Sequence, residues 1–254
     1  MIGRATAGLQ TGFRRLVYHV LGCPCPHTRQ KWAIVWPVLS TFSRGFLRVL
    51  DAGCGAGLWT LEIAKRRPMW ELVGVDRNPE CIEKAETARA RLGVVNARFE
   101  CADLLEWSEM HSFDVIVSVM SAHYAASRGE GLRLFAKFAE FSRNGGHLVA
   151  LATRSKSETP QVACLPTVAT WDVFATGELE LLCKQTGWDV VQIQGRIGEL
   201  GTVSKQVAVA LEHRRQEIGR LLRPMLWVLM SMDAGKPRPC SAPSLMWLLV
   251  ARRR

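Results

Sequence analysis

The sequence contains no hydrophobic run long enough to cross a bilayer as a helix, which takes about 20 apolar residues. Its longest apolar-rich stretch, LLRPMLWVLMSM at residues 221–232, has 12 residues and is interrupted by Arg223 and Pro224. Residues 1–22 carry arginines and lack the continuous apolar core and small-residue cleavage site of a secretory signal. We therefore expect neither a transmembrane helix nor a signal peptide in these segments.

No two cysteines are spaced as C-x-x-C. Cys23 and Cys25 lie close to His27, but no second pair has matching spacing, so a zinc site is not expected. Scattered, unpaired thiols are typical of a reducing cytosol, and we predict a cytoplasmic protein without a bound metal. The eight cysteines stand at positions 23, 25, 54, 81, 101, 164, 183 and 240.

Acidic residues are absent from positions 1–45, which hold six basic residues. Positions 205–254 hold ten basic residues against three acids, so the net charge of +10 lies in the two flanks while the centre is slightly acidic. The flanks also carry Trp32, Trp36, Trp227 and Trp247. Basic residues beside tryptophans suit an anionic membrane surface, here the inner face of the membrane. An ordinary solvated basic face and a nucleic-acid contact are the alternatives.

The chain shows no internal repeat or low-complexity tract, and its centre alternates apolar runs with helical patterns. This alternation predicts an α/β fold with a doubly wound parallel sheet covered on both faces. Predicted strands are residues 46–51, 71–76, 96–101, 113–119 and 147–153, with helices at 57–67, 79–93 and 129–143. Residues 144–146 (NGG) are predicted to form a turn. Further predicted elements are a helix at 175–187 with Thr176 as N-cap, a segment WDVVQIQGR and a last strand at 244–253.

The stretch VLDAGCGAG joins the first predicted strand to the first predicted helix. Ligands of doubly wound sheets bind at the carboxyl ends of the strands, where Asp51, Asp76, Asp103 and Ser118 are expected. A dinucleotide site usually has the spacing G-x-G-x-x-G, whereas this chain has D-x-G-x-G-x-G. An acid before the glycines is unfavourable for a pyrophosphate and suits a cationic amino group. The pattern therefore favours S-adenosylmethionine, and a nicotinamide-dependent oxidoreductase is an alternative.

Five motifs in order resemble those of the class I S-adenosylmethionine-dependent methyltransferases: VLDAGCGAG, LVGVDRNPECIEKA, ARFECADLLEW, FDVIVSV and FSRNGGHLVAL. The resemblance implies a Rossmann-like, doubly wound, seven-stranded and mostly parallel sheet with an antiparallel last strand. It also implies that Asp51, Gly53 and Gly55 line the methionine moiety, with Ala52, Cys54 and Gly57 as further cofactor-binding residues of the same turn. By the same resemblance, Asp76 would hold the ribose, Arg77, Asp103 and Leu104 would meet the adenine, and Ser118 would lie near the ligand.

The acceptor is less defined by the sequence. An acceptor hydroxyl needs a base, and His123, just past the fourth strand, is the candidate catalytic residue. No Asn-Pro-Pro-Tyr motif follows that strand, which argues against nucleic acid. The later segments resemble methyltransferases of small molecules and of lipid or polysaccharide precursors. We expect a small or lipid-like acceptor methylated at oxygen; a non-catalytic S-adenosylmethionine-binding module is the second alternative.

The same resemblance suggests a domain organisation. Residues 1–45 are expected to form a helical N-terminal cap, and residues 46–254 the methyltransferase domain. Within that domain, insertions at about 155–175 and 198–243 are expected to cover the acceptor. Their tryptophan, methionine and leucine content suits an apolar or aromatic acceptor better than a highly charged one.

Overall fold

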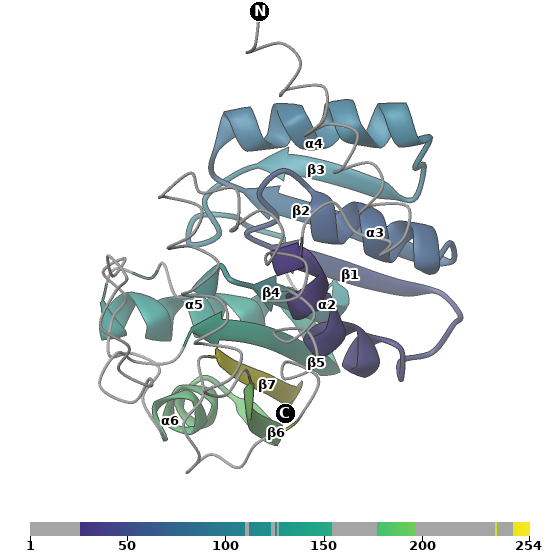
Figure 1. Ribbon diagram of the computed structural model, residues 1–254. Coiled ribbons are helices and arrows are strands. Elements are labelled where there is room, and N and C mark those ends of the chain that lie inside the picture. Colours follow the sequence, from purple (N-terminus) through teal and green to yellow (C-terminus); the bar gives the residue numbers. More distant parts are fainter. Residues whose placement is uncertain are drawn as a thin grey trace, which may run out of the picture.

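The computed structural model describes residues 26–109, 112–122, 125, 127–153, 177–196, 237 and 246–254. A seven-stranded sheet with the order β3-β2-β1-β4-β5-β7-β6 forms its centre (Figure 1). Strands β1 to β5 run parallel, and β7 is antiparallel to both β5 and β6. The strands are β1 (Leu47–Ala52), β2 (Trp70–Asp76), β3 (Ala97–Cys101), β4 (Phe113–Val119), β5 (Ser142–Thr153), β6 (Trp188–Arg196) and β7 (Met246–Arg253). The predicted fold class is confirmed.

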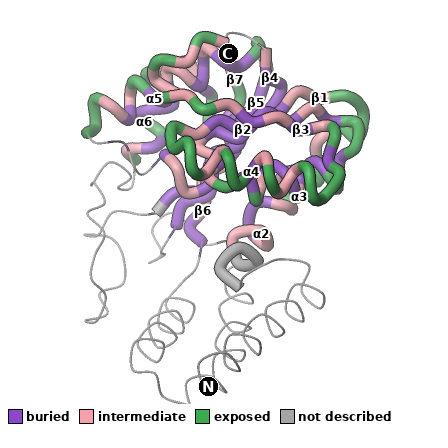
Figure 2. Tube along the Cα trace, turned by 90° about the horizontal axis from the view of Figure 1, so that it is seen from above, coloured by how far each residue is buried: buried purple, intermediate pink, exposed green. Residues whose placement is uncertain are grey.

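Helices cover both faces of the sheet (Figure 2). One apolar core lies between the sheet and the helices α2, α3 and α4, and a second lies between the sheet and α5 and α6. Both faces of a parallel sheet are thereby dry, which explains why β4 is buried along its whole length. The helices are α2 (Pro26–Leu39), α3 (Leu58–Arg66), α4 (Pro79–Leu92), α5 (Arg128–Phe141) and α6 (Glu178–Gln185).

Local signals set the ends of the helices. At the start of α4 the Asn78 side chain accepts a hydrogen bond from the Glu80 N–H (3.0 Å), and the left-handed Gly93 ends the helix. The N-cap of α6 is Gly177, with φ 86°, and not the Thr176 expected from the sequence. Thr176 itself lies outside the described residues. A glycine in this conformation can begin the helix without a side-chain cap.

The NGG segment is not a turn before β5, as the sequence suggested, but part of that strand. Ser142 pairs with Phe113 and His147 pairs with Val115, so the register shifts across the segment. Gly145 takes a φ of 77°, which lets the strand absorb the extra residues as an irregularity. The strand therefore begins five residues earlier than the apolar pattern indicates.

Helix α2 is attached to the rest of the fold by stacked rings. Trp32 stacks on Trp36 with centroids 4.9 Å apart, and it also packs against Trp59 of α3 at 4.9 Å. The guanidinium of Arg66 lies over both rings of α2, at 5.0 and 5.2 Å. Trp247, in β7, is buried. Three of the four flank tryptophans thus pack within the fold, and Trp227 lies outside the described residues.

Among the described residues, no helix has the length and apolarity needed to span a membrane. The expected insertions at about 155–175 and 198–243 lie outside or almost wholly outside the part of the chain that the structure describes.

Candidate cofactor site

The segment after β1 makes a tight turn that depends on glycine. Gly53, Gly55 and Gly57 all have positive φ angles, 77°, 53° and 73°. A Cβ on Gly57 would lie 2.8 Å from the Cβ of Ala85 and closer still to the ring of Phe99, so no side chain fits there. A Cβ on Gly55 would meet no atom within 4 Å. The turn is thus packed against the core at Gly57 and open at Gly55.

Asp76, the last residue of β2, is tied to this turn. One carboxylate oxygen accepts a hydrogen bond from the Gly55 N–H at 2.8 Å, and the other accepts one from the Asn78 N–H at 2.9 Å. Two backbone donors therefore fix the orientation of this carboxylate, while the residue stays partly exposed. A fixed carboxylate with remaining lone pairs is suited to accept hydrogen bonds from a diol.

The end of β4 lies beside the glycine turn and is also held by polar contacts. Ser121 donates a hydrogen bond to the Ala52 carbonyl at 2.5 Å, and its hydroxyl also lies 2.8 Å from that of the buried Ser118. Met120, between the two, has a φ of 60°, which is unfavourable for a residue with a side chain. Such strain concentrates at functional sites, and here it turns Ser121 toward the neighbouring strand end.

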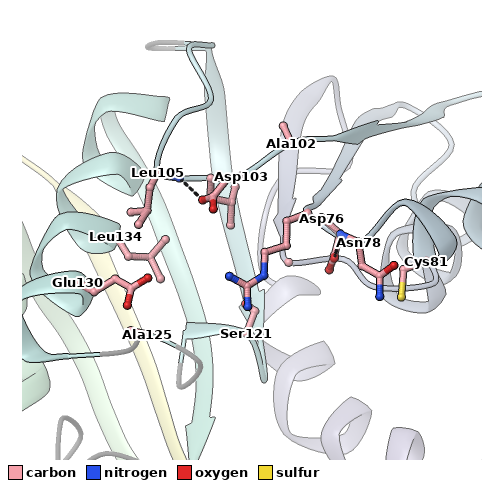
Figure 3. Close-up of a pocket in the computed structure, with 13 residues that line it drawn as sticks. Asp76, Asn78, Cys81, Ala102, Asp103, Leu105, Ser121, Ala125, Glu130 and Leu134 are labelled. Atoms are coloured by element: carbon pink, nitrogen blue, oxygen red, sulfur yellow. Dashed lines mark hydrogen bonds between the residues drawn. The ribbon is translucent and has the colours of Figure 1, made fainter.

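Residues from the ends of β1 to β4 and from α4 and α5 line one pocket of about 400 Å³ (Figure 3). Its wall carries three acids and one guanidinium, a combination that suits a ligand with positive charge and hydrogen-bond donors. Asp103 is oriented by the Leu105 N–H, which donates to its carboxylate at 2.9 Å. The lining residues are Gly53, Asp76, Arg77, Asn78, Cys81, Ala102, Asp103, Leu104, Leu105, Ser121, Ala125, Glu130 and Leu134.

Asp51 is buried just behind this wall rather than on it. Its carboxylate accepts a hydrogen bond from the Thr60 hydroxyl at 2.6 Å and is 2% exposed. Burial raises the pKa of Asp51 from 3.8 to about 6, and the neighbouring charge of Asp76 adds to the rise, although the bonds from Thr60 oppose it. In this structure the acid before the glycines therefore anchors the first turn of α3.

The residues expected from the sequence fall into two groups. Five of them line the pocket: Gly53, Asp76, Arg77, Asp103 and Leu104. The others support the wall from behind or from the turn: Asp51, Ala52, Cys54, Gly55, Gly57 and Ser118. Burial raises the pKa of the Cys54 thiol well above its usual range, which suits a packed turn residue. His123 lies outside the described residues.

Several lining residues were not anticipated from the sequence. Asn78 and Cys81 follow β2 directly, so their proximity to a strand end was available as a signal. Glu130 and Leu134 are one helical turn apart on α5, and both line the pocket. Nothing in the local sequence indicates that this face of α5 borders the ends of β2 and β3. In the part of the chain that the structure describes, no cluster of histidine, cysteine and acidic side chains could hold a metal ion.

The fold and the pocket together define a nucleotide-binding protein of the Rossmann-like class, with a glycine turn after β1 and acids after β2 and β3. The pocket fits S-adenosylmethionine by its chemistry. Asp76 and Asp103 offer acceptors for hydroxyl and amino groups, and the open side of Gly55 leaves room for close approach.

Comparison with known proteins agrees with this assignment. Residues 49–146 match a family model described as a methyltransferase domain. A ubiquinone biosynthesis O-methyltransferase of Neisseria meningitidis is 27% identical over 164 residues, which cover 58% of this chain and 66% of that protein. A trans-aconitate 2-methyltransferase of Pseudomonas aeruginosa is 34% identical over 83 residues, 33% of this chain and 28% of that protein. The chain thus matches less than two thirds of the length of these relatives.

A solved structure extends the likeness to the fold as a whole. A putative sarcosine dimethylglycine methyltransferase from Galdieria sulphuraria superposes with a TM-score of 0.63 over 88% of this chain and 84% of that chain, at 16% identity. Residues 49–146 thus form a methyltransferase domain, and the described fold is that of S-adenosylmethionine-dependent methyltransferases, which implies S-adenosylmethionine as the cofactor.

Proposed function

We propose that the protein transfers the methyl group of S-adenosylmethionine to an oxygen atom of a small or lipid-like acceptor. The observation that carries this proposal is the pocket itself. Its wall joins the D-x-G-x-G-x-G turn to Asp76 and Asp103 at the ends of adjacent strands. The match to an O-methyltransferase of ubiquinone biosynthesis supports oxygen as the methylated atom and a small molecule as the acceptor.

Each residue of the wall has a role in this proposal. Asp76, fixed by the Gly55 and Asn78 N–H groups, accepts hydrogen bonds from the ribose hydroxyls. Asp103 and Leu104 contact the adenine, and the turn at Gly53 and Gly55 lies against the methionine moiety. When bound, S-adenosylmethionine supplies an electrophilic methyl group. The protein's own contribution is then to align the acceptor oxygen and to exclude water, which can supply several kcal/mol.

His123 is the proposed base for an acceptor that carries a hydroxyl group. Ser121 and Ala125, two residues before and two residues after it in the sequence, both line the pocket. The base would take the hydroxyl proton as the oxygen acquires the methyl group. In enzymes generally, a side chain positioned as a general base typically increases turnover about 100-fold or more.

The proposal is tested by methyl transfer from labelled S-adenosylmethionine into a cell extract, followed by mass spectrometry for products that gain one methylene. We expect a labelled small or lipid-like product. Replacing His123 by alanine should lower turnover at least about tenfold and leave cofactor affinity unchanged. Cofactor binding without any labelled product would contradict the proposed activity. Unchanged turnover in His123→Ala would exclude His123 as the base.

A further inference from the structure

The edge of the sheet opposite the pocket, formed by the amino ends of β1, β2 and β3, carries a row of exposed apolar side chains. Phe46, Met69 and Val95 come immediately or shortly before β1, β2 and β3, and they are 64%, 59% and 90% exposed. Leu92, at the end of α4, is 40% exposed. Half of the eight large apolar side chains exposed in the described residues are these four. We call Phe46, Met69, Leu92 and Val95 the apolar row.

The strand register places these residues next to one another. Leu47 pairs with Trp70, so the residues before them, Phe46 and Met69, are neighbours at the amino ends of β1 and β2. The pairing of β2 with β3 continues the same edge to the residues that precede β3. Figure 1 shows these strand starts at the edge of the sheet away from the loops that follow β1, β2 and β3.

Basic side chains surround the apolar row. Arg44, Lys65 and Arg91 are exposed, and no carboxylate of the described residues lies within ion-pair distance of them. The acids nearby are already engaged: Glu71 pairs with Arg48 at 3.1 Å, and Glu62 pairs with the neighbouring helix residue Arg66. The edge therefore combines exposed apolar side chains with an excess of positive charge.

The segment before β1 that carries Arg44 is held in place. The indole N–H of Trp70 donates to the Ser43 carbonyl at 2.9 Å, and Arg67 donates to the Ser40 carbonyl at 3.1 Å. Arg67 is itself buried and packs over the rings of Trp36 and Trp70, at 5.0 and 5.3 Å. The apolar row and its cations thus stand on a rigid edge.

We propose that this edge docks on an anionic membrane surface. Cations beside a few protruding apolar side chains complement a layer of acidic headgroups over acyl chains. A stable protein interface takes about 20–30 residues on each side, far more than this row provides. The surface differs from the flanks that the sequence indicated, because Lys65 and Arg91 lie in the central region. Docking by this edge leaves the pocket at the opposite edge of the sheet.

Flotation of the full chain with vesicles tests this docking independently of any methyl transfer. We expect binding to phosphatidylglycerol-containing vesicles at about 0.1 M salt, and release at about 1 M salt, where the Debye length falls to about 3 Å. Vesicles of phosphatidylcholine alone should not bind. Replacing Lys65 and Arg91 by glutamine should weaken binding about 25-fold, about fivefold for each cation at roughly 1 kcal/mol.

A second variant separates the apolar contribution. Phe46→Ser with Met69→Ser should abolish flotation, whereas Val191→Ser, at an exposed valine of β6, should float as the wild type does. Unchanged thermal unfolding by circular dichroism confirms that both variants are folded. Failure of the wild type to float at low salt, or flotation of the double serine variant, overturns the proposal. A wild-type dimer that becomes a monomer in that variant would instead assign the row to a second copy.

Discussion

At the scale of single residues, Asp51 shows how burial changes the role of a motif residue. The sequence pattern suggested a carboxylate facing a cationic ligand. The structure turns that carboxylate toward Thr60 and removes it from water. The resulting high pKa means that the folded protein holds a proton between pH 3.8 and about 6 that the unfolded chain has already released.

This proton has a consequence for stability. Because the pKa of Asp51 is raised on folding, its contribution to the free energy of unfolding falls as the pH rises through that window, by about 3 kcal/mol in all. The asparagine of the Asp51→Asn variant cannot ionise. This variant should therefore not show the fall in the free energy of unfolding that Asp51 causes between pH 4 and pH 7. Urea unfolding of both proteins at the two pH values, without cofactor, measures the difference. Asp189→Asn, at an exposed position of β6, should show the same change in the free energy of unfolding between the two pH values as the wild type. If Asp51→Asn also shows the wild-type change, the burial argument is contradicted.

At the scale of elements, the turn between β1 and α3 contains glycines that are needed for two different reasons. Gly57 is required because side chains of the core occupy the space beside it. Gly55 has open space instead, and its N–H orients Asp76. The second kind of glycine is the one expected where a ligand approaches the backbone.

A matched pair of substitutions tests this distinction. Gly55→Ala and Gly93→Ala both place a methyl group at a positive φ with no atom within 4 Å, so each should lower the free energy of unfolding by about 1–2 kcal/mol. Only Gly55→Ala should weaken the binding of S-adenosylhomocysteine, at least about tenfold, which corresponds to about 1.4 kcal/mol. Isothermal titration calorimetry and urea unfolding give the two quantities. Equal affinities in the two variants would show that the ligand does not approach Gly55.

At the scale of the whole molecule, cofactor binding should stabilise the fold, because the pocket joins four strand ends and two helices. S-adenosylhomocysteine at about 100 times its Kd adds about 2.7 kcal/mol, or about 5–10 °C in Tm. NAD⁺ should give no shift, which distinguishes this protein from a nicotinamide oxidoreductase. At the same ligand concentration, Asp76→Asn should shrink the shift and Asp189→Asn should not. A shift produced by NAD⁺ alone would contradict the cofactor assignment.

The sequence by itself determined the order of strands and helices from β1 to α6, the glycine turn and the acids at or just past the ends of β2 and β3. These follow from local patterns, namely apolar periodicity, caps and the position of a residue relative to a strand end. The wrong predictions were local as well. NGG was predicted as a turn but belongs to β5, because pairing with β4 extends the strand. Thr176 was predicted as the N-cap of α6, but the N-cap is Gly177.

Only the tertiary structure decided which side chains face the pocket. Asp51 is the last but one residue of β1 and Asp76 is the last residue of the parallel strand β2, yet Asp51 is buried against α3 and Asp76 stays at the wall. Glu130 reaches the wall from a helix whose sequence carries no such signal, and the apolar row exists only because three strand starts meet at one edge. Side-chain orientation and proximity across strands depend on packing between distant segments. No local pattern in the chain encodes that packing.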